Sequence, residues 1–420
     1  MNPEIFPDFF FEKNVALSTM FADKYLQKQK NTAKLKVMPH RGLGISVVIP
    51  CFREPGILQT LESLNRCSLP HCSVEVIILI NHSEVAPNEI KTFNHSTKEA
   101  VDLWISKNKK EGIRFFAIGP VELQKKWAGA GLARKSGMDE AVRRFNLLQK
   151  PNGIIVSLDA DTLVAENYFI EIETHFKKHT KQAGATILFE HQTLGLKKKQ
   201  LEGIRFYEKY LAYYKKALQY TAYPYSMFTV GSAFAVTAEA YVKRGGMNRR
   251  QAGEDFYFLQ NLVQIGTVGE ITTTKVFPSA RLSDRVPFGT GPILQKWMND
   301  EEDLTIAFNF QAFADLKKLF DLKEKFFLIN ETTFVKLITK LPESIKQFLE
   351  EDNFWNELND LNKNCSTPET FNLRFFYQFN AFKILKFLNF AHNKFYKKDN
   401  LENQITILNN FYNEEQTSRN

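Results

Sequence analysis

The chain has 420 residues, of which 44% are hydrophobic and 24% charged, and its formal net charge is +8. This composition is typical of a folded protein with a sizeable core, and it excludes a disordered chain. No apolar run reaches the ~18 to 20 residues that a membrane-spanning helix needs, and Met1 to Lys13 does not resemble a secretory signal, so we expect a cytoplasmic protein.

The positive charge is unevenly distributed along the chain. Residues 1–299 carry 40 Lys and Arg against 28 Asp and Glu, whereas residues 300–420 carry 15 against 19. A basic surface attracts anions, but no signature of a nucleic-acid-binding fold accompanies it. We therefore expect no nucleic-acid partner, and we favour a small phosphate-bearing ligand or an anionic membrane surface.

Strands and helices alternate through the middle of the chain. Residues 1–44 form an N-terminal arm with a helix near 14–28, and residues 45–291 form the domain that follows. In that domain we predict strands at 45–51, 74–81, 112–118, 154–158 and 185–190, and helices at 56–66, 132–148, 165–179 and 196–220. Strands separated by helices predict an α/β fold with a mainly parallel sheet.

Beyond residue 292 the alternation ends and the pattern becomes helical. Residues 292–420 predict a C-terminal helical domain. The alternative is a helix that lies on a membrane surface near 374–398, where lysines accompany Phe375, Phe376, Phe379, Phe382 and Phe390. Acids elsewhere in this region favour the helical domain, and peripheral contact with the inner face of a membrane stays as the alternative.

The most informative motif is Asp159-Ala160-Asp161, which directly follows the strand at 154–158. Ligands of open α/β sheets bind beyond the carboxyl ends of the strands, so both carboxylates stand where a ligand is expected. Two carboxylates at this spacing suit a divalent cation bound to a diphosphate. The alternative is that the two acids only precede the helix near Ala165.

Two further segments place polar residues at the same edge of the predicted sheet. The loop after the first strand holds Pro50, Phe52 and Glu54, and the second strand ends at Asn81. Far downstream, Glu254-Asp255 opens an amphipathic helix. Acids at a helix start are often only partners of the helix dipole, but the company of the other segments favours a functional site.

Taken in order, these motifs resemble the inverting family-2 glycosyltransferases with the GT-A fold. The resemblance spans residues 45–291. It rests on Val-Val-Ile-Pro-Cys-Phe-Arg-Glu, Ala-Arg-Lys-Ser-Gly, Asp-Ala-Asp, Gly-Gly-Met and Gly-Glu-Asp. It implies that a nucleoside-diphosphate sugar is the donor and that a hydroxyl group is the acceptor. Where relatives often carry an aspartate after the second strand, this chain has Asn81-His82, so the nucleotide base is left open.

The resemblance also implies roles for individual residues. Pro50, Phe52, Glu54 and Asn81 would embrace the nucleotide base. Asp161 would bind Mg²⁺ or Mn²⁺, which prefer oxygen ligands, and Asp159 would bind the cation or the donor ribose. One acid of Glu254-Asp255, preferably Asp255, would be the general base.

Arginines supply the positive charge that a diphosphate needs. The helix beginning near Leu132 carries Arg134, which the resemblance places beside the diphosphate. Arg281 and Arg285 lie in a Gly-containing segment after the last predicted strand, and they suggest a lid over the donor. An ordinary exposed loop is the alternative for that segment.

We expect a hexosyltransferase of glycan biosynthesis that adds single sugars, because the Gln-x-x-Arg-Trp motif of processive relatives is missing. The acceptor could be a glycan, a lipid-linked sugar or a small molecule. Two other functions stay open. A sugar-nucleotide nucleotidyltransferase would need a Gly-rich triphosphate loop after the first strand, and a non-catalytic nucleotide-sugar-binding protein would not depend on the site acids.

Overall fold

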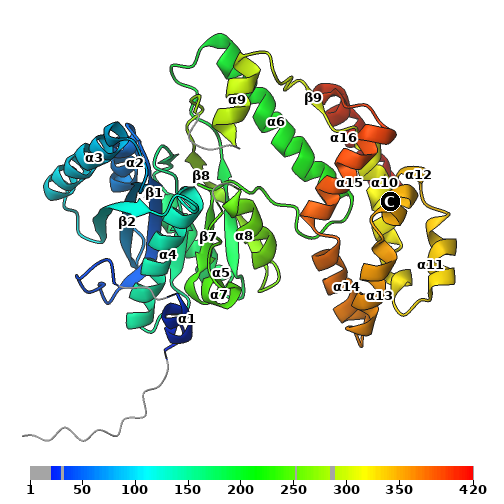
Figure 1. Ribbon diagram of the computed structural model, residues 1–420, viewed down its shortest axis with the longest axis horizontal. Coiled ribbons are helices and arrows are strands. Elements are labelled where there is room, and N and C mark those ends of the chain that lie inside the picture. Colours follow the sequence, from blue (N-terminus) through cyan, green and yellow to red (C-terminus); the bar gives the residue numbers. More distant parts are fainter. Residues whose placement is uncertain (1–19, 30–32, 251–252, 284–288, 420) are drawn as a thin grey trace, which may run out of the picture.

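The computed structural model describes residues 20–29, 33–250, 253–283 and 289–419. Figure 1 shows two parts, which we call the α/β region (residues 43–277) and the helical region (residues 290–419). The long helix α6 (Lys198–Tyr220) runs from the first part to the second.

Eight strands of the described residues form one sheet in the order β3-β2-β1-β4-β7-β6-β8-β5. The pairs β1–β2, β2–β3, β1–β4 and β6–β8 are parallel, and β7 runs antiparallel between β4 and β6. The strands are β1 (Leu43–Cys51), β2 (Ser73–Ser83), β3 (Ile113–Leu123), β4 (Ile154–Ser157), β5 (Leu163–Val164), β6 (Gly184–Phe189), β7 (Phe234–Thr237) and β8 (Val268–Phe277).

Helices cover both faces of this sheet, because successive side chains of a strand point to opposite sides. Val47 and Ile49 of β1 pack in one apolar core with α2, α3 and α5, whereas Val48 packs in another with α1, α4, α7 and α8. The helices are α1 (Asp23–Lys28), α2 (Ile57–Arg66), α3 (Asn88–Lys107), α4 (Ala130–Leu147), α5 (Tyr168–Lys178), α7 (Ala238–Arg244) and α8 (Glu254–Leu262).

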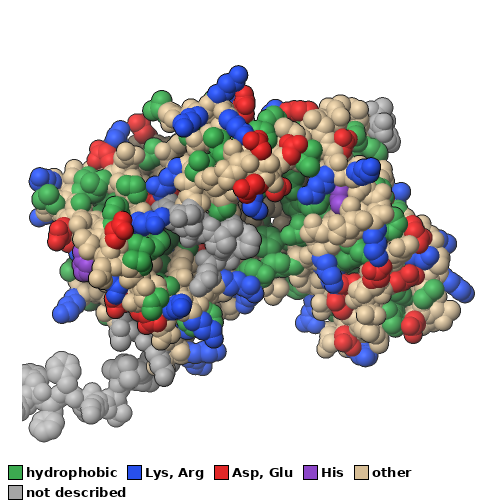
Figure 2. Space-filling view, turned by 45° about the horizontal axis from the view of Figure 1, so that its top comes forward, with side chains coloured by type: hydrophobic (Ala, Val, Ile, Leu, Met, Phe, Trp, Pro, Cys, Tyr) green, Lys and Arg blue, Asp and Glu red, His purple; other side chains and the backbone are tan. Residues whose placement is uncertain are grey.

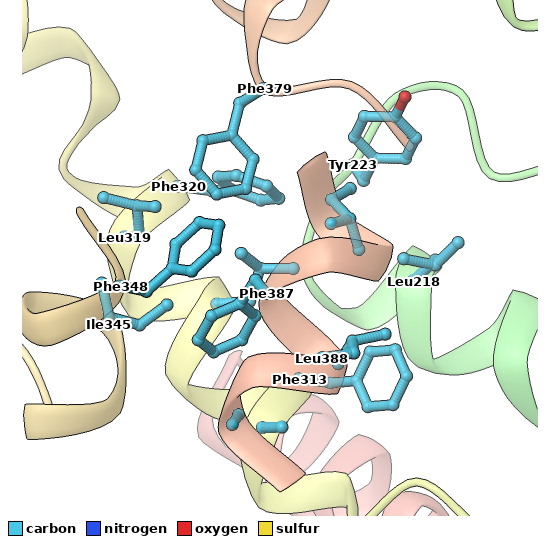
Figure 3. Close-up of a cluster of buried hydrophobic side chains, with 14 of the residues drawn as sticks. Leu218, Tyr223, Phe313, Leu319, Phe320, Ile345, Phe348, Phe379, Phe387 and Leu388 are labelled. Carbon is cyan, nitrogen blue, oxygen red and sulfur yellow. The ribbon is translucent and has the colours of Figure 1, made fainter. Parts of the chain in front are cut away.

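The helical region has a separate core rich in phenylalanine. Phe320, Phe348, Phe379 and Phe387 meet there with leucines and isoleucines, and Leu218 and Tyr223 join them from the α6 side (Figure 3). The elements are α9 (Thr290–Met298), β9 (Ile306–Ala307), α10 (Phe310–Asp321), η1 (Lys323–Phe326), α11 (Glu331–Ile338), α12 (Glu343–Glu351), α13 (Phe354–Lys363), α14 (Pro368–Gln378), α15 (Ala381–Lys394), β10 (Asp399–Asn400) and α16 (Leu401–Arg419).

Part of the apolar face of the membrane-surface alternative is buried in this arrangement. Phe375, Phe376 and Phe379 are buried in the helical core, and the neighbouring Lys383 and Lys386 both pair with Asp352. Within the described residues, no helix combines the length and apolar character needed to cross a bilayer.

The predicted fold class, a mainly parallel α/β sheet followed by a helical region, is confirmed. Several described elements of the α/β region were not predicted, among them the short β5 and α7. The antiparallel β7 was not expected, and α3 lies between β2 and β3 where no helix was predicted. Of the arm helix predicted near 14–28, the described part is α1, since residues 1–19 lie outside the described residues.

Candidate active site

A cavity of about 600 Å³ opens at the carboxyl ends of β1, β2 and β4. Beyond these strand ends, its wall includes the start of α4, the segment before β7, the start of α8 and the segment that follows β8. The predicted site residues in its lining are Pro50, Phe52, Glu54, Asn81, Arg134, Asp159, Asp161, Glu254, Asp255 and Arg281. Arg285 lies outside the described residues, so its predicted role stays a prediction.

Arg134 on α4 joins the two acid pairs that the sequence separates by almost a hundred residues. Its guanidinium donates to Asp159 Oδ1 at 2.9 Å and to Glu254 Oε1 at 3.2 Å. It also donates to Ser157 Oγ at 2.5 Å and to the Gly231 carbonyl at 3.1 Å. Only 3% of the side chain is exposed, so Arg134 is not a solvated arginine on a helix face.

These contacts also determine the charge state of Arg134. Burial lowers its pKa, but Asp159 and Glu254 compensate for burial and the pKa is raised above its usual value. A permanently charged guanidinium therefore lies between the two acid pairs. Its position fits a role in organising these acids, and contact with a diphosphate stays a prediction.

The two neighbouring acids of α8 have different surroundings. Gly253 adopts φ 68°, a left-handed conformation that glycine tolerates, and the chain turns there into the helix. Glu254 is buried and paired with Arg134, whereas Asp255 is half-buried in the cavity wall. The Asp255 Oδ1 accepts from the Phe256 amide at 2.7 Å, while Oδ2 points toward Gly231.

The pKa of Asp255 is raised to about 7, first by burial and then by the negative charge of Glu254, with Arg134 opposing both effects. A carboxylate with a pKa near neutral pH can accept a proton efficiently, because it is ionised and still basic. Of the two acids, Asp255 therefore has the better surroundings for a general base.

A second arginine occupies the other half of the cavity. Arg281 donates to both carboxylate oxygens of Glu54 and, at 2.9 Å, to Asp161 Oδ2. Burial lowers the pKa of Arg281, but the bonds to Glu54 and the charge of Asp161 raise it overall. The structure thus places Arg281 against two acids in the floor of the cavity, and a role in binding the donor stays a prediction.

The loop after β1 is held by side-chain hydrogen bonds from its neighbours. Arg53 adopts φ 46°, unusual for a residue with a side chain, and its amide donates to Asn94 Oδ1 at 3.0 Å. Asn81 is buried and donates through Nδ2 to the Cys51 carbonyl at 3.0 Å. Asn81 therefore fixes the loop that carries Phe52 and Glu54, in addition to lining the cavity.

The donor set suits a divalent cation only in part. Carboxylate oxygens are the ligands that Mg²⁺ and Mn²⁺ prefer, and Asp161 and Asp159 line one cavity. Yet among the described residues no group of three or more His, Cys, Asp or Glu side chains could hold a metal ion. A cation here would need further oxygen ligands, and the phosphates of a bound nucleotide could supply them.

Several lining residues were not singled out in the sequence. Tyr207 of α6 lies off the aromatic stripe by which that helix packs on the helical core, which is formed by Phe206, Tyr210, Tyr213 and Tyr220. Ser232 precedes a strand that was not predicted. His82 follows Asn81, and burial lowers its pKa. The position of His82 after the predicted second strand is a sequence signal for that residue, and no such signal points to Tyr207 or Ser232.

The outer surface gives less information than the cavity. Figure 2 shows acidic and basic side chains intermixed over both parts, and hydrophobic side chains gathered in the hollow between them. This face therefore shows no single large patch of one charge among the described residues.

Neither a protein-family model nor a curated protein matches this chain. Among solved structures, S. aureus TarS 1-349 in complex with UDP-GlcNAc is similar with a TM-score of 0.41 and 10% identity, over 80% of this chain and 92% of that chain. Mannosyltransferase PcManGT from Pyrobaculum calidifontis, in complex with GDP-Man and Mn²⁺, has a TM-score of 0.35 and 11% identity over 88% and 92%.

A third similar structure is glucosyl-3-phosphoglycerate synthase from Mycobacterium tuberculosis, in complex with Mn²⁺, UDP and phosphoglyceric acid. Its TM-score is 0.34 with 12% identity, over 66% of this chain and 88% of that chain. At such values these likenesses carry no argument about the chemistry of this chain, which rests on its own cavity.

Proposed function

We propose that this protein is an inverting glycosyltransferase that moves a sugar from a nucleoside-diphosphate sugar to a hydroxyl acceptor. One observation carries the proposal: Arg134 binds Asp159 and Glu254 at once, so the Asp-x-Asp acids and the acids of α8 share one cavity. Inversion needs a leaving group on one side of the sugar and a base on the other, and two acid sites in one cavity can meet that need.

The donor half of the cavity is the part around Asp161, Glu54 and Arg281. A nucleotide there would lie at the strand ends, where α/β sheets bind their ligands. Asp161, together with phosphate oxygens, would hold Mg²⁺ or Mn²⁺, which stabilises the charge that develops on the departing diphosphate. Arg281, which contacts Glu54 and Asp161, would then also face that diphosphate.

Asp255 would be the general base. It would accept the proton of the acceptor hydroxyl as that oxygen forms its bond to the anomeric carbon, while the bond from that carbon to the diphosphate breaks. Its pKa of about 7 fits proton transfer near neutral pH, and general base catalysis contributes ~10² to 10⁴-fold. The donor sugar, the nucleotide base and the acceptor are not specified by these residues.

The test is a panel of UDP-, GDP-, dTDP- and CDP-sugars with Mn²⁺ or Mg²⁺, scored by release of the nucleoside diphosphate. Asp255→Asn should retain donor binding in calorimetry and lose about 10²-fold or more in transfer. Asp360→Asn, on the exposed face of α13, is the control. Unchanged transfer by Asp255→Asn, or a product with retained anomeric configuration, would contradict the proposal.

A further inference from the structure

A chain of polar side chains connects the interior of the protein to the cavity wall beside Asp255. His191 is buried, and its Nδ1 lies 2.8 Å from Glu208 Oε1, which also accepts from the His191 amide at 2.7 Å. The His191 Nε2 lies 3.0 Å from Thr290 Oγ1. Thr290 and Tyr207 both line the cavity, and the Thr290 side chain lies close enough to lower the pKa of the Tyr207 phenol.

The chain of hydrogen bonds has a defined direction. A carboxylate can only accept, so the proton of a neutral imidazole must be on Nδ1, facing Glu208. The Nε2 of His191 then accepts, so Thr290 donates to it. The oxygen of Thr290 keeps the capacity to accept a hydrogen bond, and the phenol of Tyr207 can both donate to a ligand and accept from one.

The end of this chain lies beside the proposed general base. Tyr207 and Thr290 both line the cavity that contains Asp255. Burial and the charge of Asp255 raise the pKa of Tyr207 to about 12, so the phenol keeps its proton near neutral pH. Tyr207 therefore offers a neutral hydroxyl, and it does not compete with Asp255 as a base.

The same wall carries more hydroxyl groups. Thr229 and Ser232 line the cavity, and the buried Ser232 Oγ has no hydrogen-bond partner among the described residues. We call Tyr207, Thr229, Ser232 and Thr290 the hydroxyl wall.

The positively charged side chains in the described cavity lining are already paired with carboxylates. Among the described lining residues, the Lys and Arg side chains are Arg134 and Arg281, and each pairs with two carboxylates. A phosphorylated acceptor near Asp255 would meet hydroxyl groups and negative charge. An uncharged carbohydrate, whose hydroxyls both donate and accept, matches the hydroxyl wall.

We propose that the hydroxyl wall binds the acceptor and that the acceptor is an uncharged carbohydrate. Tyr207 and Thr290 contact one of its hydroxyls and leave the reacting hydroxyl to Asp255. His191 and Glu208 are positioning residues that orient these contacts. This inference rests on the proposed glycosyltransferase function.

The experiment compares two acceptor classes and two pairs of variants. Donor turnover is measured with neutral methyl glycosides and disaccharides, and separately with sugar phosphates and with water alone. Tyr207→Phe and His191→Phe should each raise the KM for the neutral sugar about tenfold, and the KM for the donor by much less. His191→Gln, which keeps a donor and an acceptor, should recover part of the loss.

Matched controls remove the same groups elsewhere. Tyr210→Phe removes a phenol hydroxyl about one turn further along α6. His175→Phe removes a histidine of α5 whose Nε2 bonds to Gln182. Neither Tyr210 nor His175 lines the cavity. Both controls should keep wild-type KM values, and thermal unfolding checks that every variant is folded.

Three outcomes would overturn the inference: turnover with sugar phosphates only, no response to neutral sugars at saturating concentration, or equal changes in donor and acceptor KM. Absence of metal-dependent donor hydrolysis in the wild type would instead contradict the proposed function itself.

Discussion

The two parts of the molecule bury different kinds of side chain. The α/β region buries charged groups, such as Arg134 with Glu254 and Arg144 with Glu75, beside aliphatic strands. The helical region has a core dominated by phenylalanine rings, and it reaches the described cavity lining only through Thr290 and Gly291. Most of the proposed site and the phenylalanine core therefore lie in different parts of the sequence, and variants should affect one with little effect on the other.

The largest expected effect comes from removing the acid at the floor of the cavity. Asp161→Ala should lower kcat by at least about 10² to 10³-fold, the range for loss of a group that stabilises transition-state charge. It should also abolish the Mn²⁺-dependent stabilisation by nucleoside diphosphate in thermal unfolding. Asp321→Ala, an exposed acid of α10, is the control. Metal dependence retained by Asp161→Ala would remove that residue from the cation site.

The opposite behaviour is expected in the helical core. Phe375 is fully buried and its ring contacts Phe326 and Phe354. Phe375→Ala should lower the free energy of unfolding by ~3 to 5 kcal/mol in urea titrations, because it leaves a cavity. At temperatures where the variant is folded, kcat should match the wild type.

The comparison for that variant is Leu373→Ala on the same helix, where 51% of the leucine is exposed, and its stability should change little. A kcat loss in Phe375→Ala without loss of stability would show that the two parts are not separable.

The third prediction concerns pH. If Asp255 is the general base that we propose, transfer requires its ionised form, so kcat should fall about tenfold per pH unit below about 7. The contribution of Asp255 to the free energy of unfolding should change with pH in the opposite direction to kcat. Because the folded-state pKa is raised above 3.8, the unfolded state binds fewer protons between the two values, and stability from this group falls as pH rises from about 4 to about 7.

Asp255→Asn should therefore lack the acid limb of the rate profile, and its thermal midpoint at pH 8 should be above that of the wild type. An acid limb that persists in this variant would assign the ionisation to another group.

Much of the cavity could be predicted because parallel strands bring their carboxyl ends to one edge. Asp159, Asp161 and Glu54 each follow a strand, and Asn81 lies near the end of one, so their proximity follows from the order of the strands. The acids of α8 were placed there only by resemblance, because nothing local in the sequence connects them to Arg134.

Other features depend on contacts between distant segments. The stretch 88–107 has a weak apolar face, with Val101 as its buried apolar residue, so its helical period is hard to detect. Strand β7 has four residues and is held by pairing with β4 and β6. Tyr207 was missed because the aromatic stripe of α6 that packs in the core lies on neighbouring positions.

The smallest effect on kcat is expected at a contact between the helical region and α8, the helix that carries Asp255. Phe382 of α15 stacks on Tyr257 with ring centroids 4.3 Å apart and contacts Phe256 at 4.6 Å. Both partners belong to α8, directly after Asp255. Aromatic pairs contribute ~0.5 to 1.5 kcal/mol beyond burial, so Phe382→Ala should lower kcat several-fold by loosening α8, with the donor KM nearly unchanged.

Phe390→Ala is the matched control, because Phe390 lies on the same helix and packs on Phe348 and Phe395. Phe382→Tyr keeps the ring and should restore kcat. If both alanine variants lower kcat equally, the loss reflects general destabilisation of α15. A loss confined to Phe382→Ala would mean that the helical region helps to hold α8, the helix that carries Asp255.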